Sequence, residues 1–432
     1  MATDVAGSAE DTETEAKVFR RRVFYIPGYD PIHPRRYREL YRKEGADQAA
    51  ISGYQLELRP RQSKGPYGWH VLSEIGGEKA EAEIEVLVWS DIVRNSMSNS
   101  IPATYLQLVR TAWAYIASGA LFRLMRLRKG PVIAALYPIV FLLAQLAIAV
   151  GVGWTLGLLA AFSAAMIPFL QDHDSWARGM VTVLGLILLG LSVATVTAIL
   201  ILRWFKAKDG KVFAYYLMHD YAYSARYGGA NPPELEARMA EFGRAIRLAL
   251  ETDADEVLVI GHSSGAHLGV SILADLIRDG LPKDHPPLSF LSLGQVVPMV
   301  SFLPKAKRLR ADLAFLSKQA SLTWVDVTAP GDGCAFALCD PVAVTSVAPK
   351  DQRWPLVLSA AFTQTLSPER WKELRWKFFR LHFQYLCAFD RPGDYDYFQI
   401  TAGPIPLGQR YAGRPASKSR IDRAVNRFTD IS

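Results

Sequence analysis

The chain has 432 residues, half of them apolar, and a formal net charge of +7. That length allows one large domain or two ordinary ones, with a sizeable core. The three cysteines, Cys334, Cys339 and Cys387, are too few and too irregularly spaced for a disulfide framework or a zinc site. The sequence therefore predicts no metal, no cofactor and a reducing compartment.

Lys and Arg gather in short clusters, at residues 20–22, 35–43, 123–129, 203–211 and 305–310. No nucleic-acid-binding module accompanies them, so no nucleic acid is expected as a partner. The clusters at 123–129 and 203–211 flank very apolar segments, which favours contact with an anionic membrane face. The other clusters are expected to form ordinary solvated surface.

The chain begins with polar and acidic residues, 1–18, which predict a disordered tail and lack the apolar core of a signal peptide. Residues 19–100 then read as a β-rich unit with one inserted helix. Strands are expected at 23–26, 54–58, 69–75 and 82–89, and the helix at 35–49.

The character of the chain changes over residues 101–211. Residues 106–127 have helical periodicity, with large apolar residues mixed with arginines, and predict an amphipathic, interfacial helix. Residues 131–170 and 180–202 carry no charge. A bilayer core needs about 20 apolar residues per helix, so these runs predict an inserted transmembrane helical hairpin.

After residue 211 helical patterns alternate with short apolar strands. Helices are expected at 215–223, 232–250 and 266–278, and strands at 257–260, 288–293 and 322–327. This alternation predicts an α/β fold, with a mostly parallel sheet covered by helices on both faces. The unit is expected to span residues 212–412, followed by a flexible tail at 413–432.

One stretch carries a chemical signature. The apolar strand at 257–260 runs into Gly261-His262-Ser263-Ser264-Gly265, and small and apolar residues follow. The pattern G-x-S-x-G alone is weak, but between a strand and a helix it predicts a serine held on a sharp turn. These residues resemble the nucleophile elbow of the α/β-hydrolase superfamily. The resemblance implies an α/β-hydrolase-like sheet with Ser263 as the nucleophile.

The superfamily's other catalytic groups follow the serine along the chain, first an Asp or Glu and then a His. Of the three later histidines, His267 lies at the start of the elbow helix and His285 in a polar loop. His382 comes late in the chain, where the superfamily places its base, and is the predicted base. For the acid the sequence leaves three choices, with Asp332 preferred over Asp340 and Asp326.

The resemblance also implies an oxyanion hole. Its donors would be the backbone N–H of Ser264 and one from the loop after the first strand, where Gly28 lets the backbone approach and Tyr29 supplies the N–H. The membrane insertion departs from the superfamily pattern, because lids usually follow the elbow and this segment precedes it.

Together these features predict a membrane-anchored serine hydrolase that cleaves an ester, a thioester or a lipid acyl bond. The expected partners are membrane lipids and an acyl ester or lipid-like substrate, while the oligomeric state is left open. A catalytically idle scaffold with this fold and an acyltransferase with the same triad are the alternatives. A transporter is disfavoured, because the apolar runs carry no charge.

The oxyanion donor and the nucleophile must lie side by side. The loop with the donor precedes the membrane insertion and the nucleophile follows it, so the two halves of the domain should form one sheet on one side of the membrane. That requires an even number of crossings. We expect one crossing within 131–170, with the remainder tilted, interfacial or re-entrant, and a second at 180–202. The positive-inside rule then predicts an integral protein of a bacterial-type inner or plasma membrane, with its catalytic halves cytoplasmic.

Overall fold

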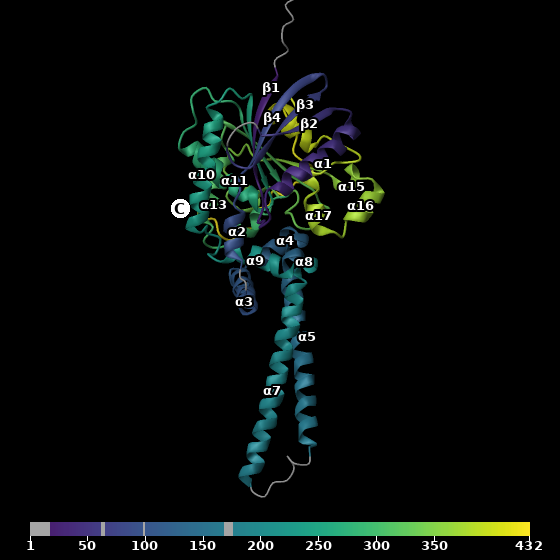
Figure 1. The fold of residues 1–432 in the computed structure, drawn as a ribbon. Helices are drawn as coiled ribbons and strands as arrows, with labels where there is room; N and C mark the ends of the chain where they lie inside the picture. The colour runs from purple at the N-terminus through teal and green to yellow at the C-terminus, as the bar shows by residue number, and fades with distance from the viewer. Residues whose placement is uncertain (1–17, 62–64, 98–99, 168–175) are drawn as a thin grey trace, which may run out of the picture.

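The computed structural model describes residues 18–61, 65–97, 100–167 and 176–432. The tail and most of the polar loop between the apolar runs lie outside these residues. At the centre is one eight-stranded sheet with the order β2-β3-β4-β1-β5-β6-β7-β8 (Figure 1). The strands are β1 (Phe19–Ile26), β2 (Gln55–Pro60), β3 (Gly68–Ile75), β4 (Glu78–Val86), β5 (Glu256–His262), β6 (Leu288–Leu293), β7 (Leu322–Thr328) and β8 (Leu356–Ser359).

The sheet is mostly parallel. β1 runs parallel to both β4 and β5, and β5 to β8 continue in parallel, whereas β3 is antiparallel to its two neighbours. The predicted α/β class is therefore confirmed, and so is the prediction that the strands on either side of the insertion form one sheet. β8 has four residues and was not predicted.

Helices cover both faces of the sheet because its strands are apolar on both sides. In β1, Val23 and Tyr25 point into one core, while Phe24 and Ile26 point into the other. Figure 1 shows α10, α11 and α13 on one side, and α1, α15, α16 and α17 on the other. The longer helices of the domain are α1 (Arg35–Ser52), α9 (Ala214–Ala225), α10 (Pro233–Leu250), α11 (Ser264–Arg278) and α13 (Lys307–Leu316). The shorter ones are α2 (Ser90–Ser96), α8 (Asp209–Val212), α12 (Val297–Ser301), α14 (Pro341–Val344), α15 (Phe362–Thr365), α16 (Pro368–Leu374), α17 (Phe378–His382), η1 (Gln384–Leu386), α18 (Tyr397–Ala402) and α19 (Leu407–Arg410).

Two of the basic clusters expected at the solvated surface contain buried arginines. Arg21 is paired with Glu256 at 2.6 Å in the sheet and donates to the backbone carbonyl of Ile405. Arg310 is buried and donates to the carbonyls of Ser301 and Leu303. The expectation was wrong for these two side chains, because backbone carbonyls, and for Arg21 also a buried carboxylate, satisfy their guanidinium groups.

Two helices are long and apolar enough to cross a membrane, α5 (Lys129–Ala165) and α7 (Trp176–Ala207). Within the first uncharged run, the residues up to Ala165 form a single helix without a break at Gly151 or Gly153. The two helices touch through small residues. A Cβ on Gly153 would come within 2.5 Å of the Ala194 carbonyl oxygen, and one on Gly157 within 2.4 Å of that of Gly190. Such contacts bring two backbones together as in membrane helix pairs.

The hairpin of α5 and α7 projects from one end of the domain (Figure 1). Two helices precede it, α3 (Ile101–Ala117) and α4 (Ala120–Leu127), in the region expected to be one interfacial helix. The first turns of α5 pack into the domain, where Val132 joins Leu124, Leu127, Met299 and Phe302 in a separate apolar cluster.

The chain end expected to be a flexible tail lies against the domain. Ile421 pairs with Cys339, Asn426 is buried and donates to the Ser301 carbonyl, and Asp430 forms an ion pair with Lys307 at 2.6 Å. Its polar composition concealed these contacts, which are made mainly by backbone groups and by one buried amide.

Candidate active site

The turn after β5 holds Ser263 in a strained conformation. Its φ of 57° and ψ of −119° lie outside the regions that L residues prefer. The flanking glycines are needed because neighbouring backbone atoms lie too close for a side chain at either position. A Cβ on Gly265 would lie 2.1 Å from the Ile26 carbonyl oxygen, and one on Gly261 would lie 2.6 Å from that of Gly265. The Ser263 N–H donates to the Leu293 carbonyl at 2.9 Å, which fixes the turn to the end of β6.

The loop after β1 lies beside this turn because β1 and β5 are adjacent parallel strands, with Ile26 opposite Gly261. A Cβ on Gly28 would lie 3.1 Å from the Ser263 Cβ and 3.5 Å from its Oγ. Within the described part of the chain, the backbone N–H groups of Tyr29 and Ser264 have no hydrogen-bond acceptor. The structure thus places Gly28, Tyr29 and Ser264 around Ser263 with two N–H groups free.

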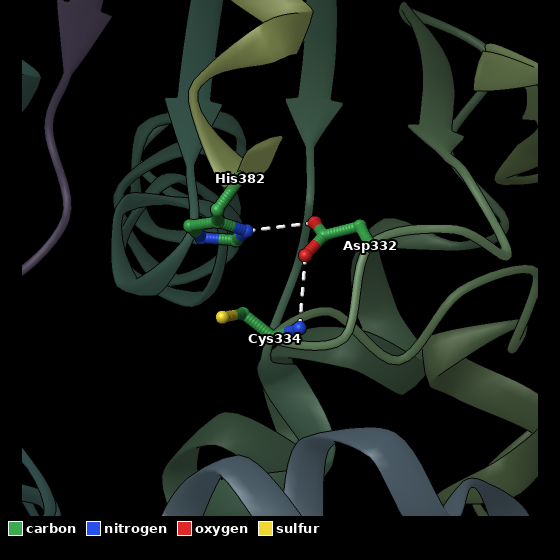
Figure 2. A group of neighbouring side chains, drawn as sticks. All are labelled: Asp332, Cys334 and His382. Carbon is green, nitrogen blue, oxygen red and sulfur yellow. Dashed lines mark hydrogen bonds and ion pairs between the residues drawn. The ribbon is translucent and has the colours of Figure 1, made fainter. Parts of the chain in front are cut away.

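Asp332 and His382 meet across the carboxyl edge of the sheet. Asp332 stands in the loop after β7, and His382 is the last residue of α17. The His382 Nδ1 lies 2.7 Å from the Asp332 Oδ2, and both side chains are buried. The Tyr385 hydroxyl donates to the same oxygen at 3.0 Å, and the Cys334 N–H donates to Oδ1 at 2.8 Å. Figure 2 shows Asp332 held between His382 and the backbone of Cys334.

These three donors determine the charge of the acid. Burial alone would raise the pKa of the Asp332 carboxyl, but the His382 ring and the donated hydrogen bonds lower it below its ordinary value. Asp332 is therefore a carboxylate at neutral pH. The other ring nitrogen of His382, Nε2, is buried and has no hydrogen-bond partner among the described residues. That nitrogen is available to accept a proton.

The alternative acids are engaged elsewhere. The Asp326 Oδ1 accepts from the Ser292 hydroxyl at 2.5 Å inside the sheet, and burial raises the pKa of Asp326 to about 8. Asp340 caps α14, accepting from the N–H groups of Val342 and Ala343. Neither is within hydrogen-bonding contact of a histidine among the described residues.

The alternative bases are also apart from Asp332. His267 is buried in α11, and burial lowers its pKa to about 4. The His285 Nδ1 lies 2.7 Å from the Pro286 carbonyl oxygen in its own loop. Of the candidates considered, the structure brings together Asp332 and His382.

Two neighbours of this pair were missed by sequence reasoning. Tyr385 links Asp332 to the Ala329 N–H, which donates to its hydroxyl at 3.0 Å. Tyr385 follows His382 by three positions, and this spacing of about one helical turn was the sequence signal that could have identified it as a neighbour. The His262 ring lies 4.9 Å from the His382 ring, and its Nε2 donates to the His382 carbonyl at 3.0 Å. Burial lowers the pKa of His262 to about 3, so it is a neutral positioning group.

A small cavity, partly open to solvent, adjoins the turn. Its lining includes Tyr29, Asp220, Ser264 and His267. Burial raises the pKa of the Asp220 carboxyl to about 7, against the opposing influence of the His382 ring. The cavity could not be foreseen from the sequence, because residues from distant parts of the chain line it.

The donor atoms of Asp332, Cys334 and His382 lie within 4.8 Å of one another, which is close enough for a metal ion. The bonds that these atoms make in the structure fit a hydrogen-bonded pair better than a metal site. The His382 Nδ1 and the Asp332 Oδ2 bond each other, and burial together with Asp332 raises the pKa of the Cys334 thiol well above its ordinary value. A metal would need the thiolate.

We compared the chain with protein-family models, with curated proteins and with solved structures. None of the three comparisons finds a match. The functional assignment therefore rests on the geometry of the site.

Proposed function

We propose that this protein is a serine hydrolase of the α/β-hydrolase type, anchored in a membrane by the hairpin of α5 and α7. Its substrate is an ester, a thioester or a lipid acyl group. The observation that carries the proposal is the set of groups at the carboxyl edge of the sheet: a serine on a strained turn, two free N–H groups beside it, and a buried Asp-His pair with its outer nitrogen unpartnered.

In the proposed reaction the Ser263 Oγ attacks the acyl carbonyl carbon, and its proton passes to the His382 Nε2. Asp332 stabilises the imidazolium that forms and fixes the tautomer of the ring. The N–H groups of Tyr29 and Ser264 bind the oxyanion, an interaction that commonly contributes about 3–4 kcal/mol to transition-state stabilisation. The imidazolium then protonates the leaving group, and water activated by His382 hydrolyses the acyl-enzyme.

The membrane part of the proposal uses the charge distribution. Arg and Lys gather at 123–129, up to the first residue of α5, and at 203–211, from the last turns of α7 onward, whereas the connecting segment has few cations. By the positive-inside rule both catalytic halves are cytoplasmic, in a bacterial-type inner or plasma membrane. Because α5 is one helix whose first turns pack on the domain, the hairpin makes two crossings. A membrane-impermeant thiol reagent should label a cysteine introduced at Ser175 from outside intact cells, but not one introduced at Ser419.

Labelling with a fluorophosphonate probe tests the catalytic part. We expect the wild-type protein to react with the probe and Ser263→Ala to lose all labelling. Ser264→Ala is the matched control, because it removes a neighbouring hydroxyl and keeps the backbone N–H. A folded wild-type protein that never reacts would instead support the idle scaffold. Product analysis with an added alcohol separates hydrolysis from acyl transfer.

A further inference from the structure

A run of exposed aromatic and basic residues follows α16 and continues into the first residues of α17. Six consecutive residues, Arg375-Trp376-Lys377-Phe378-Phe379-Arg380, are all exposed. Trp376 is 72% exposed and Phe378 is 47% exposed. We call these six residues the aromatic-basic segment. Three large aromatic side chains in water at one place mark an interaction surface.

The segment adjoins the place where the two long helices leave the domain. The Phe379 ring lies 5.7 Å from that of Phe213, which follows α7 and α8 in the chain. The Phe378 ring packs on Gly333, where a Cβ would come within 3.3 Å of it. Gly333 in turn lies against Gly130 at the beginning of α5. A Cβ on Gly130 would come within 3.3 Å of the Gly333 carbonyl oxygen. In Figure 1, α17 lies in the half of the domain from which the hairpin projects.

We propose that the aromatic-basic segment lies in the headgroup layer of the anionic leaflet that surrounds the base of the hairpin. This proposal rests on the membrane crossing of α5 and α7 proposed above. Trp concentrates at membrane interfaces, Phe on an interfacial segment inserts toward the acyl chains, and cations beside them are attracted to anionic lipids.

A second exposed surface lies on α3, which Figure 1 shows beside the base of the hairpin. Helix α3 exposes Val109 and Trp113, at 61% and 72%, on successive turns of one face. Nucleic acid or an acidic protein could also bind cations and aromatic rings. Neither accounts for a surface that continues directly into two helices long and apolar enough to span a bilayer.

The position of this surface identifies the class of substrate. Helix α17 begins in the aromatic-basic segment and ends at His382, and Phe378 packs on the residue next to Asp332. Seating the segment in the leaflet brings the Asp-His pair to the level of the headgroups. The substrate is then a lipid of that leaflet, with its ester bond at the boundary between headgroup and acyl chain.

The contact can be measured without reference to catalysis. The full-length protein carrying Trp376→Cys is labelled with an environment-sensitive fluorophore and placed in nanodiscs of zwitterionic and anionic lipid. Burial raises the pKa of each native cysteine, that of Cys339 to about 12, so the introduced thiol reacts selectively. Leu248→Cys is the matched control, because it is 65% exposed near the end of α10, which leads to the amino edge of the sheet.

We expect a blue-shifted emission at position 376, with quenching by spin-labelled lipid, and a water-like emission at position 248. Identical water-like spectra at both positions would overturn the proposal. So would a shift at 376 that appears only with added RNA, or only when two copies share a nanodisc.

The functional arm uses charge reversal. Arg375→Glu with Lys377→Glu should lower hydrolysis of an anionic lipid ester about tenfold or more, and leave hydrolysis of a soluble short-chain ester unchanged. Arg244→Glu with Lys318→Glu makes the same charge change on exposed residues remote from the hairpin and should have no effect. An equal loss of lipid-ester hydrolysis in both double variants would overturn the assignment of a leaflet lipid as substrate. A shifted emission in a protein without any esterase activity would leave the membrane contact standing and refute the proposed hydrolase.

Discussion

Replacing Asp332 with asparagine tests the Asp-His pair most directly, because all three of its partners donate to the carboxylate. His382 Nδ1 and the Tyr385 hydroxyl face Oδ2, and the Cys334 N–H faces Oδ1. An amide NH₂ at the Oδ1 position would face another N–H. At the Oδ2 position it would donate to Nδ1 and place the ring proton on Nε2. In that tautomer His382 cannot accept the proton of Ser263.

The size of the effect follows from the lost charge. A carboxylate 2.7 Å from the imidazolium that forms contributes about 6 kcal/mol at an effective dielectric constant of about 20. We therefore expect Asp332→Asn to lower kcat about 10⁴-fold. The assay is hydrolysis of a soluble ester by the reconstituted protein, with circular dichroism to verify the fold.

Asp326→Asn is the control for this substitution. The Asp326 carboxyl has a pKa raised to about 8 by burial, so at pH 7 it is mainly neutral and an amide mimics it. We expect its activity to stay close to that of the wild type. If Asp332→Asn kept activity within about tenfold, or if Asp326→Asn lost more, the assignment of Asp332 as the orienting acid would be wrong.

Three further predictions concern the surroundings of the pair. Tyr385→Phe removes one hydrogen-bond donor to Asp332. Because a hydrogen bond to a charged group contributes about 1.5–3 kcal/mol, kcat should fall about 10- to 100-fold, and an unchanged kcat would contradict this. Dialysis against a chelator, or Cys334→Ser, should leave turnover nearly unchanged, whereas loss on chelation with recovery on adding zinc would identify a metal site. Burial lowers the pKa of His267 to about 4, so below about pH 6.5 the unfolded state takes up a proton that the folded state does not. The contribution of His267 to the free energy of unfolding should then be full above pH 6.5 and be lost toward pH 4, by about 1.4 kcal/mol per pH unit. In His267→Gln the thermal unfolding midpoint should therefore fall less between pH 6.5 and 5 than in the wild type.

The sequence was informative where local chemistry determines structure. The glycines at 261 and 265 identified the strained turn because no side chain fits there, and the order of serine, acid and histidine along the chain selected a pair that the structure places in contact. The catalytic roles of these residues remain predictions, as do the substrate and the membrane topology.

What the sequence did not reveal depends on residues far apart in the chain. Arg21 is buried because Glu256 lies opposite it, 235 positions later, and no local pattern encodes that partner. Asp332 could not be separated from Asp326 and Asp340 by spacing, since the choice depends on which loop reaches His382. Strand β8 has only four residues, too few to show a period.

The central place of β1 has a consequence for biosynthesis. It is the first strand made, yet one of its two neighbours, β5, begins only at Glu256, after both long apolar helices have been synthesised. At about 5–20 residues per second the ribosome needs roughly 10–50 s to reach it. Throughout that interval one edge of β1 presents unpaired N–H and C=O groups. Both long apolar helices are therefore made before the sheet can close, and the nascent N-terminal strands must be kept from pairing with other chains until β5 emerges.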